Sequence, residues 1–315
     1  MKPFNFEETG GCVSDPAGIR VKFFISNRFD GLGGRLVNLM VSMTLSQWLE
    51  SRLLVHWPNG PDLAATSLEY LFSDPMMTYY RPTGPGSRIR WEMLACMAEI
   101  RSIRLVGNDD VFAAGDTVNY DAIAFRSVNL KAVADVRKMT VMGLREECAM
   151  EFARLKLQPA VLKRVSGYRY ADRLADAIGV HVRRGDLTLH HKSVHRSRAV
   201  DERAYDTILD THPKQDIFLA TDDRQMVSRF RHRYGRRVLS LCDSVLIHPG
   251  FSRLSRRAIQ FAFAEILLLS RCRKIVSGPS NFSRAAALIG NRPYILLEPD
   301  GNTDKWEQIR ENWQL

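Results

Sequence analysis

The chain has 315 residues, of which 45% are hydrophobic, and its 45 Lys and Arg against 35 Asp and Glu give a formal net charge of +10. This content supports one large domain or two of ordinary size, and the charge favours an anionic partner such as nucleic acid, a membrane surface or a phosphorylated small molecule. Five cysteines without a CxxC or paired spacing argue against a disulfide framework or a zinc site.

The first half opens with a β–α–β pattern. Strand-like runs lie at 21–26, 53–57, 103–107 and 120–125. Between the first two, a glycine-containing loop precedes an apolar helical pattern that begins at Leu36. Two apolar stripes along this pattern predict a largely buried helix. The whole unit predicts a parallel sheet.

The second half alternates strands and helices more regularly. Its strand-like runs are 176–184, 216–221, 237–241, 274–278 and 294–297. Helical patterns occupy 201–211, 222–235, 253–272 and 283–290. This alternation predicts a doubly wound α/β unit. We therefore expect an α/β protein with two Rossmann-like domains, residues 1–170 and 171–315, facing each other across a cleft.

The segment HVRRGD, 181–186, follows a predicted strand, and ligands of open parallel sheets bind outside the carboxyl ends of the strands. Strand alternation directs His181 and Arg183 to one side and Arg184 to the other. A guanidinium offers a planar fork of donors that suits phosphate oxygens. The alternative is structural, with Asp186 pairing with Arg183 or Arg184.

Two further polar segments follow predicted strands. In FLATDD, Asp222 or Asp223 is either the N-cap of the next helix or a carboxylate that binds a ligand donor or orients an arginine. The segment SNFS, 280–283, opens a helix, where hydroxyl and amide groups form a phosphate site or cap the helix. Both interpretations of SNFS can hold together.

A glycine-rich segment, FDGLGGRL at 29–36, precedes the first helix. Gly33 and its neighbours allow close approach of a ligand to the backbone. The dinucleotide fingerprint GxGxxG is not matched, because Leu36 stands where the third glycine or alanine belongs. The alternative is a tight turn.

Together these segments resemble the motifs of the fucosyltransferase superfamily, whose members transfer fucose from GDP-fucose. HVRRGD is similar to the first motif shared by α1,6-, α1,2- and protein O-fucosyltransferases. LATDD is similar to the second motif of the α1,6 group, which includes rhizobial nodulation enzymes, and SNFSRAA resembles the third. DGLGGRL resembles the glycine loop of the α1,2 and protein O-fucosyl branches.

The resemblance implies a GT-B-like fold, with the donor held mainly by the C-terminal domain, and inverting chemistry without a metal or other cofactor. It implies that Arg183 binds the β-phosphate of GDP and stabilises the leaving group. Asp186, close to it in the chain, is a second catalytic candidate. The donor-binding residues implied in the same way, with Arg183, are Gly33, Gly34, Arg35, His181, Arg184, Asp222, Asp223, Ser280, Asn281, Phe282 and Ser283.

Elementary chemistry agrees with an arginine in this role. Transfer breaks a C–O bond to a diphosphate, so negative charge grows on the β-phosphate oxygen and a guanidinium there stabilises the transition state more than the ground state. Candidate bases for the acceptor hydroxyl are Asp186, His190 and His191. Gly34-Arg35 differs from the Asn-Gln pair frequent in related glycine loops.

The partners expected are a nucleotide sugar and a glycan or lipo-oligosaccharide acceptor. One alternative is a transferase that uses another nucleotide sugar. Another is a nucleic-acid-binding protein, suggested by the basic run RFRHRYGRR at 229–237. That run lacks the interleaved aromatic residues of a stacking platform, so we expect no nucleic acid partner. Peripheral contact with a membrane surface stays open.

The compartment is predicted from the absence of targeting and membrane-spanning signals. The N-terminal stretch MKPFNFEETGG has no basic start followed by an apolar run. The most apolar window, 258–270, has about 13 residues, against the roughly 20 that a spanning helix needs. We therefore expect no transmembrane segment and a cytoplasmic protein with free thiols.

Overall fold

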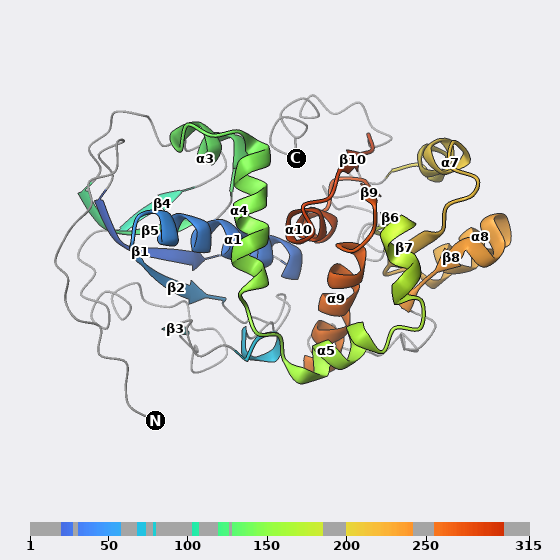
Figure 1. Ribbon diagram of the computed structural model, residues 1–315, viewed down its shortest axis with the longest axis horizontal. Coiled ribbons are helices and arrows are strands. Elements are labelled where there is room, and N and C mark those ends of the chain that lie inside the picture. Colours follow the sequence, from blue (N-terminus) through green and yellow to red (C-terminus); the bar gives the residue numbers. More distant parts are fainter. Residues whose placement is uncertain are drawn as a thin grey trace, which may run out of the picture.

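The computed structural model describes residues 20–27, 31–57, 68–73, 78–79, 103–106, 119–125, 128–184, 200–241 and 255–298. These residues form two parallel β-sheets, with helices between the sheets and around them (Figure 1). No helix among them combines the length and the apolar character needed to cross a bilayer.

The N-terminal sheet has five parallel strands in the order β3-β2-β1-β5-β4. They are β1 (Arg20–Asn27), β2 (Arg52–His56), β3 (Thr78–Tyr79), β4 (Ile103–Val106) and β5 (Asn119–Phe125). Four of the five are confirmed predictions, and the two-residue β3 was not predicted. In the central strand, Phe24 pairs with Leu53 of β2 and Ile123 of β5, which explains the apolar composition of β1.

Helix α1 (Leu32–Trp48) follows β1 and is buried from Leu32 to Ser46. It begins before the predicted start at Leu36, because Gly33 and Gly34 belong to its first turn and not to a loop. The first turn tolerates glycine because its amide groups make no intrahelical hydrogen bond. The prediction of a largely buried helix is confirmed.

The C-terminal sheet also has five parallel strands, in the order β10-β9-β6-β7-β8. They are β6 (Ile178–Val182), β7 (Ile217–Thr221), β8 (Val238–Leu239), β9 (Lys274–Ser277) and β10 (Tyr294–Leu296). The helices are α7 (Glu202–Asp210), α8 (Arg224–Tyr234), α9 (Arg256–Leu269) and α10 (Asn281–Ile289). The predicted alternation of this half is confirmed, including the end of α8 at Gly235, whose φ is +60°.

The middle of the chain leads from one sheet to the other through helices. They are α3 (Leu130–Val136), α4 (Val141–Ala153) and α5 (Pro159–Ser166), with short 3-10 helices η1 (Leu68–Tyr70) and η2 (Ala171–Asp176). Helix α4 packs against α1 and α10, and α5 packs against α9. These helices therefore contact elements of both halves.

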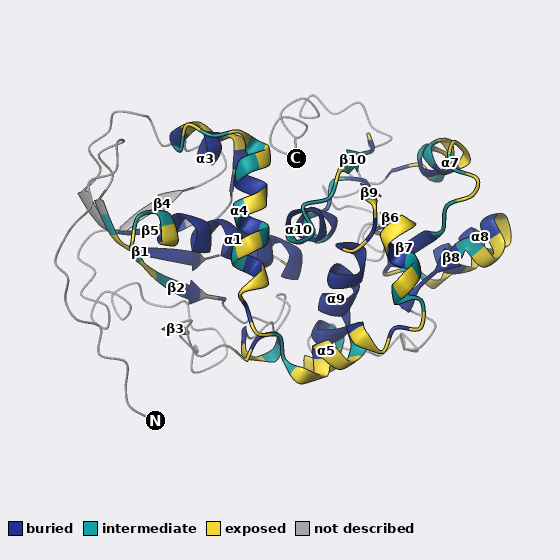
Figure 2. Cartoon of the chain, viewed as in Figure 1, coloured by how far each residue is buried: buried dark blue, intermediate teal, exposed yellow. Residues whose placement is uncertain are grey.

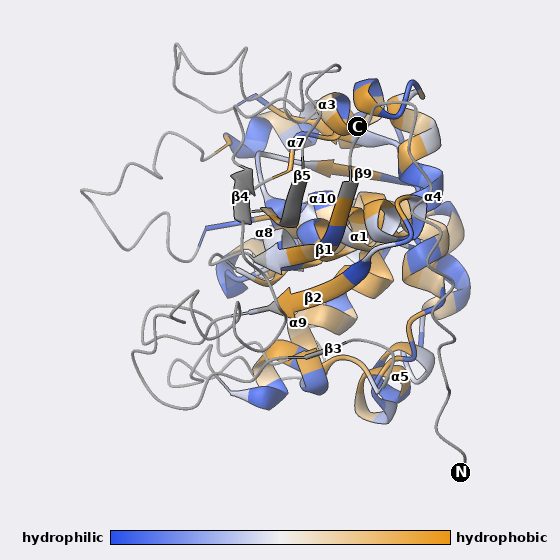
Figure 3. Cartoon of the chain, turned by 90° about the vertical axis from the view of Figure 1, so that its left-hand side faces the viewer, coloured by the Kyte–Doolittle hydropathy of each residue, from blue (hydrophilic) through white to orange (hydrophobic). Residues whose placement is uncertain are grey.

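One hydrophobic core extends across both halves, from Phe24 on β1 through Leu39 on α1 to Phe263 on α9 and Leu288 on α10. In Figure 2, α1, α9 and α10 are dark blue and α8 has a largely exposed outer face. In Figure 3, β2 is largely orange and α5 carries both colours, as an apolar strand and an amphipathic surface helix should. A domain boundary at residue 170 stays a prediction.

Candidate functional site

Three of the predicted segments meet at the carboxyl edge of the C-terminal sheet. On the central strand β6, His181 pairs in register with Ala220 of β7 and Ser277 of β9. The segment before α8 therefore lies on one side of His181 and the segment before α10 on the other. Because α10 packs against α1, the glycine segment reaches the same place (Figure 1).

His181 is buried at this edge, in a strand whose residues are all buried. Its ring stacks on Phe282 of α10, with ring centroids 4.8 Å apart and planes inclined by 17°. Burial lowers the pKa of His181 from 6.5 to about 4, an effect that nearby Asp222 opposes and Arg183 reinforces. The imidazole is therefore neutral at physiological pH, and it lies close to one acidic and one basic side chain.

The two adjacent arginines have different surroundings. Arg183 is exposed, whereas Arg184 is half-buried. The Arg184 guanidinium lies 2.8 Å from Oε1 of Glu202, and its backbone N–H donates to Oδ1 of Asp222 at 2.8 Å. Arg184 is thus bound to the start of α7, and Arg183 lies at the surface of the edge. The predicted candidates Asp186, His190 and His191 lie outside the described residues.

The two aspartates after β7 also differ. Asp223 is the N-cap of α8, because its Oδ1 accepts the backbone N–H of Gln225 at 2.8 Å. Asp222 accepts the N–H of Arg184 and so links the ends of β7 and β6. The capping interpretation is confirmed for Asp223, and Asp222 orients the arginine segment.

The SNFS segment forms the first turn of α10. Ser280 is its N-cap, and its Oγ accepts the N–H of Phe282 at 3.3 Å. Ser283 is fully buried, and its hydroxyl donates to Oγ of Ser277 at 2.9 Å, while Asn281 is half-buried. Capping is therefore confirmed for Ser280, and the phosphate interpretation of the segment stays a prediction.

The first turn of α1 touches the backbone of α10. A Cβ placed on Gly33 would lie 2.4 Å from the backbone C and O of Asn281 and the N of Phe282. No side chain larger than hydrogen fits there, so Gly33 brings the two helix N-termini into contact. The packing of the two helices alone explains why a glycine stands at position 33, without any ligand.

Gly34 and Arg35 are buried within the same helix. The Arg35 guanidinium carbon lies 6.0 Å from the centroid of the Trp57 ring, which is itself buried, so this cation lies inside the core. Contact of Gly33, Gly34 and Arg35 with a donor stays a prediction.

Sequence reasoning missed several polar residues behind this edge. The Tyr205 hydroxyl on α7 donates to the carbonyl of His181 at 3.2 Å and accepts the N–H of Gly278 at 3.3 Å. The Tyr294 hydroxyl on β10 donates to the Gly278 carbonyl at 3.2 Å. Ser277 carried a signal, a polar residue at a strand end, but the tyrosines carried none because only the fold brings them here.

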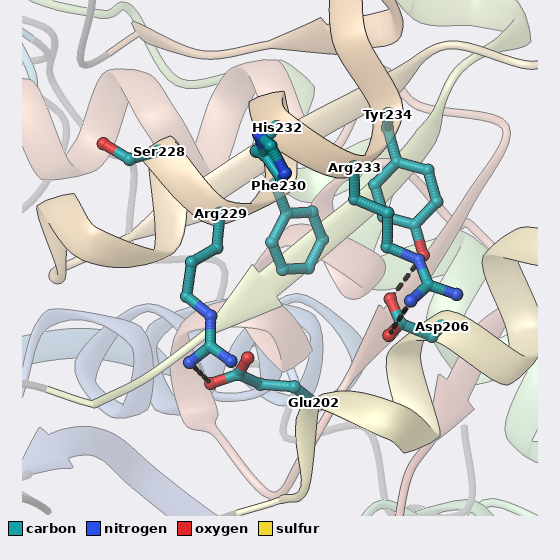
Figure 4. Close-up of a pocket in the computed structure, with 8 residues that line it drawn as sticks. All are labelled: Glu202, Asp206, Ser228, Arg229, Phe230, His232, Arg233 and Tyr234. Carbon is teal, nitrogen blue, oxygen red and sulfur yellow. Dashed lines mark hydrogen bonds and ion pairs between the residues drawn. The ribbon is translucent and has the colours of Figure 1, made fainter.

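A pocket of about 400 Å³ lies between α7 and α8 (Figure 4). Its charged side chains pair with one another: Arg229 with Glu202 at 2.7 Å, and Arg233 with Asp206 at 3.0 Å. Because Glu202 also binds Arg184, the pocket wall supports the arginine segment. Mutual neutralisation of its charges disfavours this pocket as an anion site.

The groups gathered at the strand ends suit an organic anion. An exposed guanidinium, a neutral imidazole and a helix N-terminus are hydrogen-bond donors and acceptors of the kind that hold phosphates and nucleotides. Within the described ranges, no three His, Cys, Asp or Glu side chains gather as a metal site would require.

Solved structures of fucosyltransferases share the fold. A NodZ α-1,6-fucosyltransferase soaked with GDP-fucose is 18% identical, with a TM-score of 0.52 over 89% of this chain and 96% of that chain. The fucosyltransferase NodZ from Bradyrhizobium is 18% identical, with a TM-score of 0.53 over 90% and 97%. A mutant of Arabidopsis thaliana FUT1 in complex with GDP is 13% identical, with a TM-score of 0.55 over 90% and 72%.

No protein-family model and no curated protein sequence matches the chain. The structural likeness therefore rests on architecture: two five-stranded parallel sheets joined through helices, over nine-tenths of the chain, with the C-terminal sheet in the Rossmann order. The chain has a GT-B-like α/β fold like that of these fucosyltransferase structures, which is the fold that its motifs predict.

Proposed function

We propose that this chain is an inverting, metal-independent glycosyltransferase that transfers fucose from GDP-fucose to a glycan or lipo-oligosaccharide acceptor. One observation carries the proposal. His181, Arg183 and the 280–283 segment, three parts of the motif resemblance, lie at one carboxyl edge of a parallel sheet, where open α/β sheets bind ligands. Of the structures that share this fold, the NodZ crystal was soaked with GDP-fucose and the FUT1 mutant is in complex with GDP.

In this proposal Arg183 is the cation that meets the diphosphate. It is exposed at the edge, whereas the guanidinium of Arg184 is bound to Glu202. When the bond between fucose and the β-phosphate breaks, negative charge accumulates on the leaving oxygen. A guanidinium at that oxygen stabilises the transition state by a few kcal/mol, about 10²–10³ in rate.

The neutral His181 contributes hydrogen bonding without a second positive charge. Phe282 lies flat against its ring, which fixes the plane of the imidazole at the edge of the site. A single displacement by the acceptor hydroxyl inverts the anomeric carbon and needs a base. Asp186, His190 and His191 are the candidates for that base.

The two alternatives differ in what supports them. A transferase that uses another nucleotide sugar would need the same diphosphate contact, so the donor sugar has to be tested directly. The basic run 229–237 is the sequence feature that suggests nucleic acid binding. Two of its arginines, Arg229 and Arg233, already pair with acidic residues of α7, so the run argues only weakly for a nucleic acid partner. We further propose that the protein acts in the cytoplasm.

The test is product formation from labelled GDP-fucose over a panel of glycan and lipo-oligosaccharide acceptors. We expect a fucosylated product with an inverted anomeric configuration, at the same rate with and without EDTA. GDP-mannose and UDP-sugars serve as competing donors. Transfer only from another donor supports the first alternative, and a rate abolished by EDTA contradicts metal independence.

A further inference from the structure

A chain of buried hydroxyl groups lies behind His181. Nδ1 of His181 is 3.3 Å from Oγ of Ser277, at the end of the neighbouring strand β9. Oγ of Ser277 is 2.8 Å from the carbonyl oxygen of Gly278 and 2.9 Å from Oγ of Ser283. The Tyr294 hydroxyl lies 3.2 Å from Oγ of Ser283 and closes the group. Both serines are at most 1% exposed.

The hydrogens of this group can be assigned by counting donors and acceptors. A carbonyl oxygen only accepts, so the short contact to Gly278 takes the single hydroxyl hydrogen of Ser277. The single hydrogen of Ser283 goes either to Ser277 or to the carbonyl oxygen of Ser280, 3.0 Å away, and in both cases the oxygen of Ser277 keeps a lone pair that faces Nδ1 of His181. An oxygen lone pair requires a hydrogen on the nitrogen opposite.

We infer that Ser277 and Ser283 hold His181 as the tautomer protonated on Nδ1, so that Nε2 is a hydrogen-bond acceptor. In that tautomer Nε2 has no hydrogen and carries a lone pair. The stacked Phe282 ring fixes the plane of the imidazole, and the contact of Nδ1 with Ser277 sets which ring nitrogen faces the serines. The two serines are positioning residues, because they act only through the histidine.

The consequence for recognition rests on the proposed function. An acceptor nitrogen among donor groups selects a ligand that offers an O–H or N–H at this position, as the ribose and the base of a nucleotide do. The cation Arg183 and the helix N-terminus bind the anionic part, and Nε2 binds a hydrogen donor of the neutral part. The other tautomer would present an N–H and would repel that donor.

The tautomer is tested in the wild-type protein by ¹⁵N-histidine NMR near neutral pH, with His181→Gln to assign the signal. We expect a protonated, pyrrole-type shift for Nδ1 and an unprotonated, pyridine-type shift for Nε2. A protonated Nε2 overturns the inference. This measurement needs neither a ligand nor activity.

The role of the serines is tested with Ser277→Ala, and with Ser283→Ala should the first variant not fold. We expect a mixture of tautomers in the spectrum and GDP binding weakened about tenfold. The matched control is Ser270→Ala, a buried serine whose hydroxyl donates to the Leu267 carbonyl outside this group. It should change GDP affinity less than about twofold.

The outcomes separate the two claims. An unchanged tautomer in both serine variants overturns the positioning role. Wild-type protein that shows the expected tautomer but binds no GDP supports the inference and contradicts the proposed function.

Discussion

The two halves of the molecule have the same kind of sheet, yet their carboxyl edges are different. In the C-terminal half, His181, Thr221 and Ser277 stand near or at the ends of adjacent strands. In the N-terminal half, β1 leads into α1, whose first turn packs on α10 through Gly33. Among the described residues, the C-terminal half thus gathers polar and charged side chains at its strand ends, and the N-terminal half contributes a helix that packs against them. The order of the strands does not by itself determine where a ligand can bind. The side chains that follow each strand determine it.

The largest effect expected is that of Arg183→Ala on turnover. In the proposed mechanism, loss of the guanidinium removes the charge that stabilises the leaving diphosphate, so kcat should fall about 10²–10³-fold. Circular dichroism and the unfolding temperature should stay near those of the wild type, because Arg183 is exposed. Steady-state kinetics with GDP-fucose measures the change.

The matched control is Arg231→Ala, which removes another exposed arginine from the same half, on α8. Its turnover should equal that of the wild type. Turnover of Arg183→Ala within a few-fold of wild type would mean that the arginine segment is structural and that the two edges do not differ in the way described.

The next effect concerns the stability of the C-terminal edge at acid pH. The pKa of His181 is about 4 in the folded chain against an ordinary 6.5, because burial disfavours the charged form. Between these values the unfolded chain binds a proton that the folded chain does not. The free energy of unfolding should therefore fall as the pH drops through this window, by up to about 3 kcal/mol.

Denaturant unfolding of the wild type and His181→Gln, at several pH values from 6.5 to about 4, measures this loss. The variant has no imidazole to protonate at this position. Its free energy of unfolding should therefore fall less steeply with decreasing pH than that of the wild type. Parallel curves would show that His181 does not carry the pH dependence.

A smaller effect is expected at the N-terminal edge. In Gly33→Ala the new methyl group meets backbone atoms of Asn281 and Phe282 at 2.4 Å, so the helices must separate. We expect a loss of about 1–3 kcal/mol in the free energy of unfolding, the usual range for overpacking. Gly31→Ser is the control, because nothing lies within 4 Å of its added Cβ and serine suits the N-cap position that Gly31 holds. Equal thermal stability of the two variants would refute the contact between the helix N-termini.

The smallest effect is expected for Glu202→Gln. It weakens the ion pair that holds Arg184, which is partly exposed, so stability should change by less than about 1 kcal/mol. GDP affinity should fall about twofold to fivefold as the arginine segment loosens. Glu151→Gln, in the exposed pair with Arg154, should leave GDP affinity unchanged. Calorimetric titration compares the two variants.

Most of the fold could be predicted because its strands are short apolar runs separated by helical patterns. The two-residue β3 escaped prediction, since so short a strand has no periodicity of its own. The start of α1 was placed late because glycines suggest a loop, whereas Gly33 is required by the packing of α10.

The site was predictable only where a motif follows a strand. The gathering of His181, Arg183 and Ser280 at one sheet edge could be predicted in this way, since each lies at or just after the end of a parallel strand. Ser277 lies 96 residues from His181 in the chain, and Tyr205 comes from a surface helix. Contacts of this kind arise from the sheet order, so local sequence patterns contain no trace of them.

The central claim is that the C-terminal edge binds a guanosine diphosphate without a metal. Isothermal titration of GDP into the wild-type protein and Arg183→Ala, in the presence of EDTA and with UDP as the competing nucleotide, tests it most directly. We predict saturable GDP binding to the wild type, weaker binding to the variant and none of UDP. Absence of GDP binding, or equal binding to both proteins, would contradict the account.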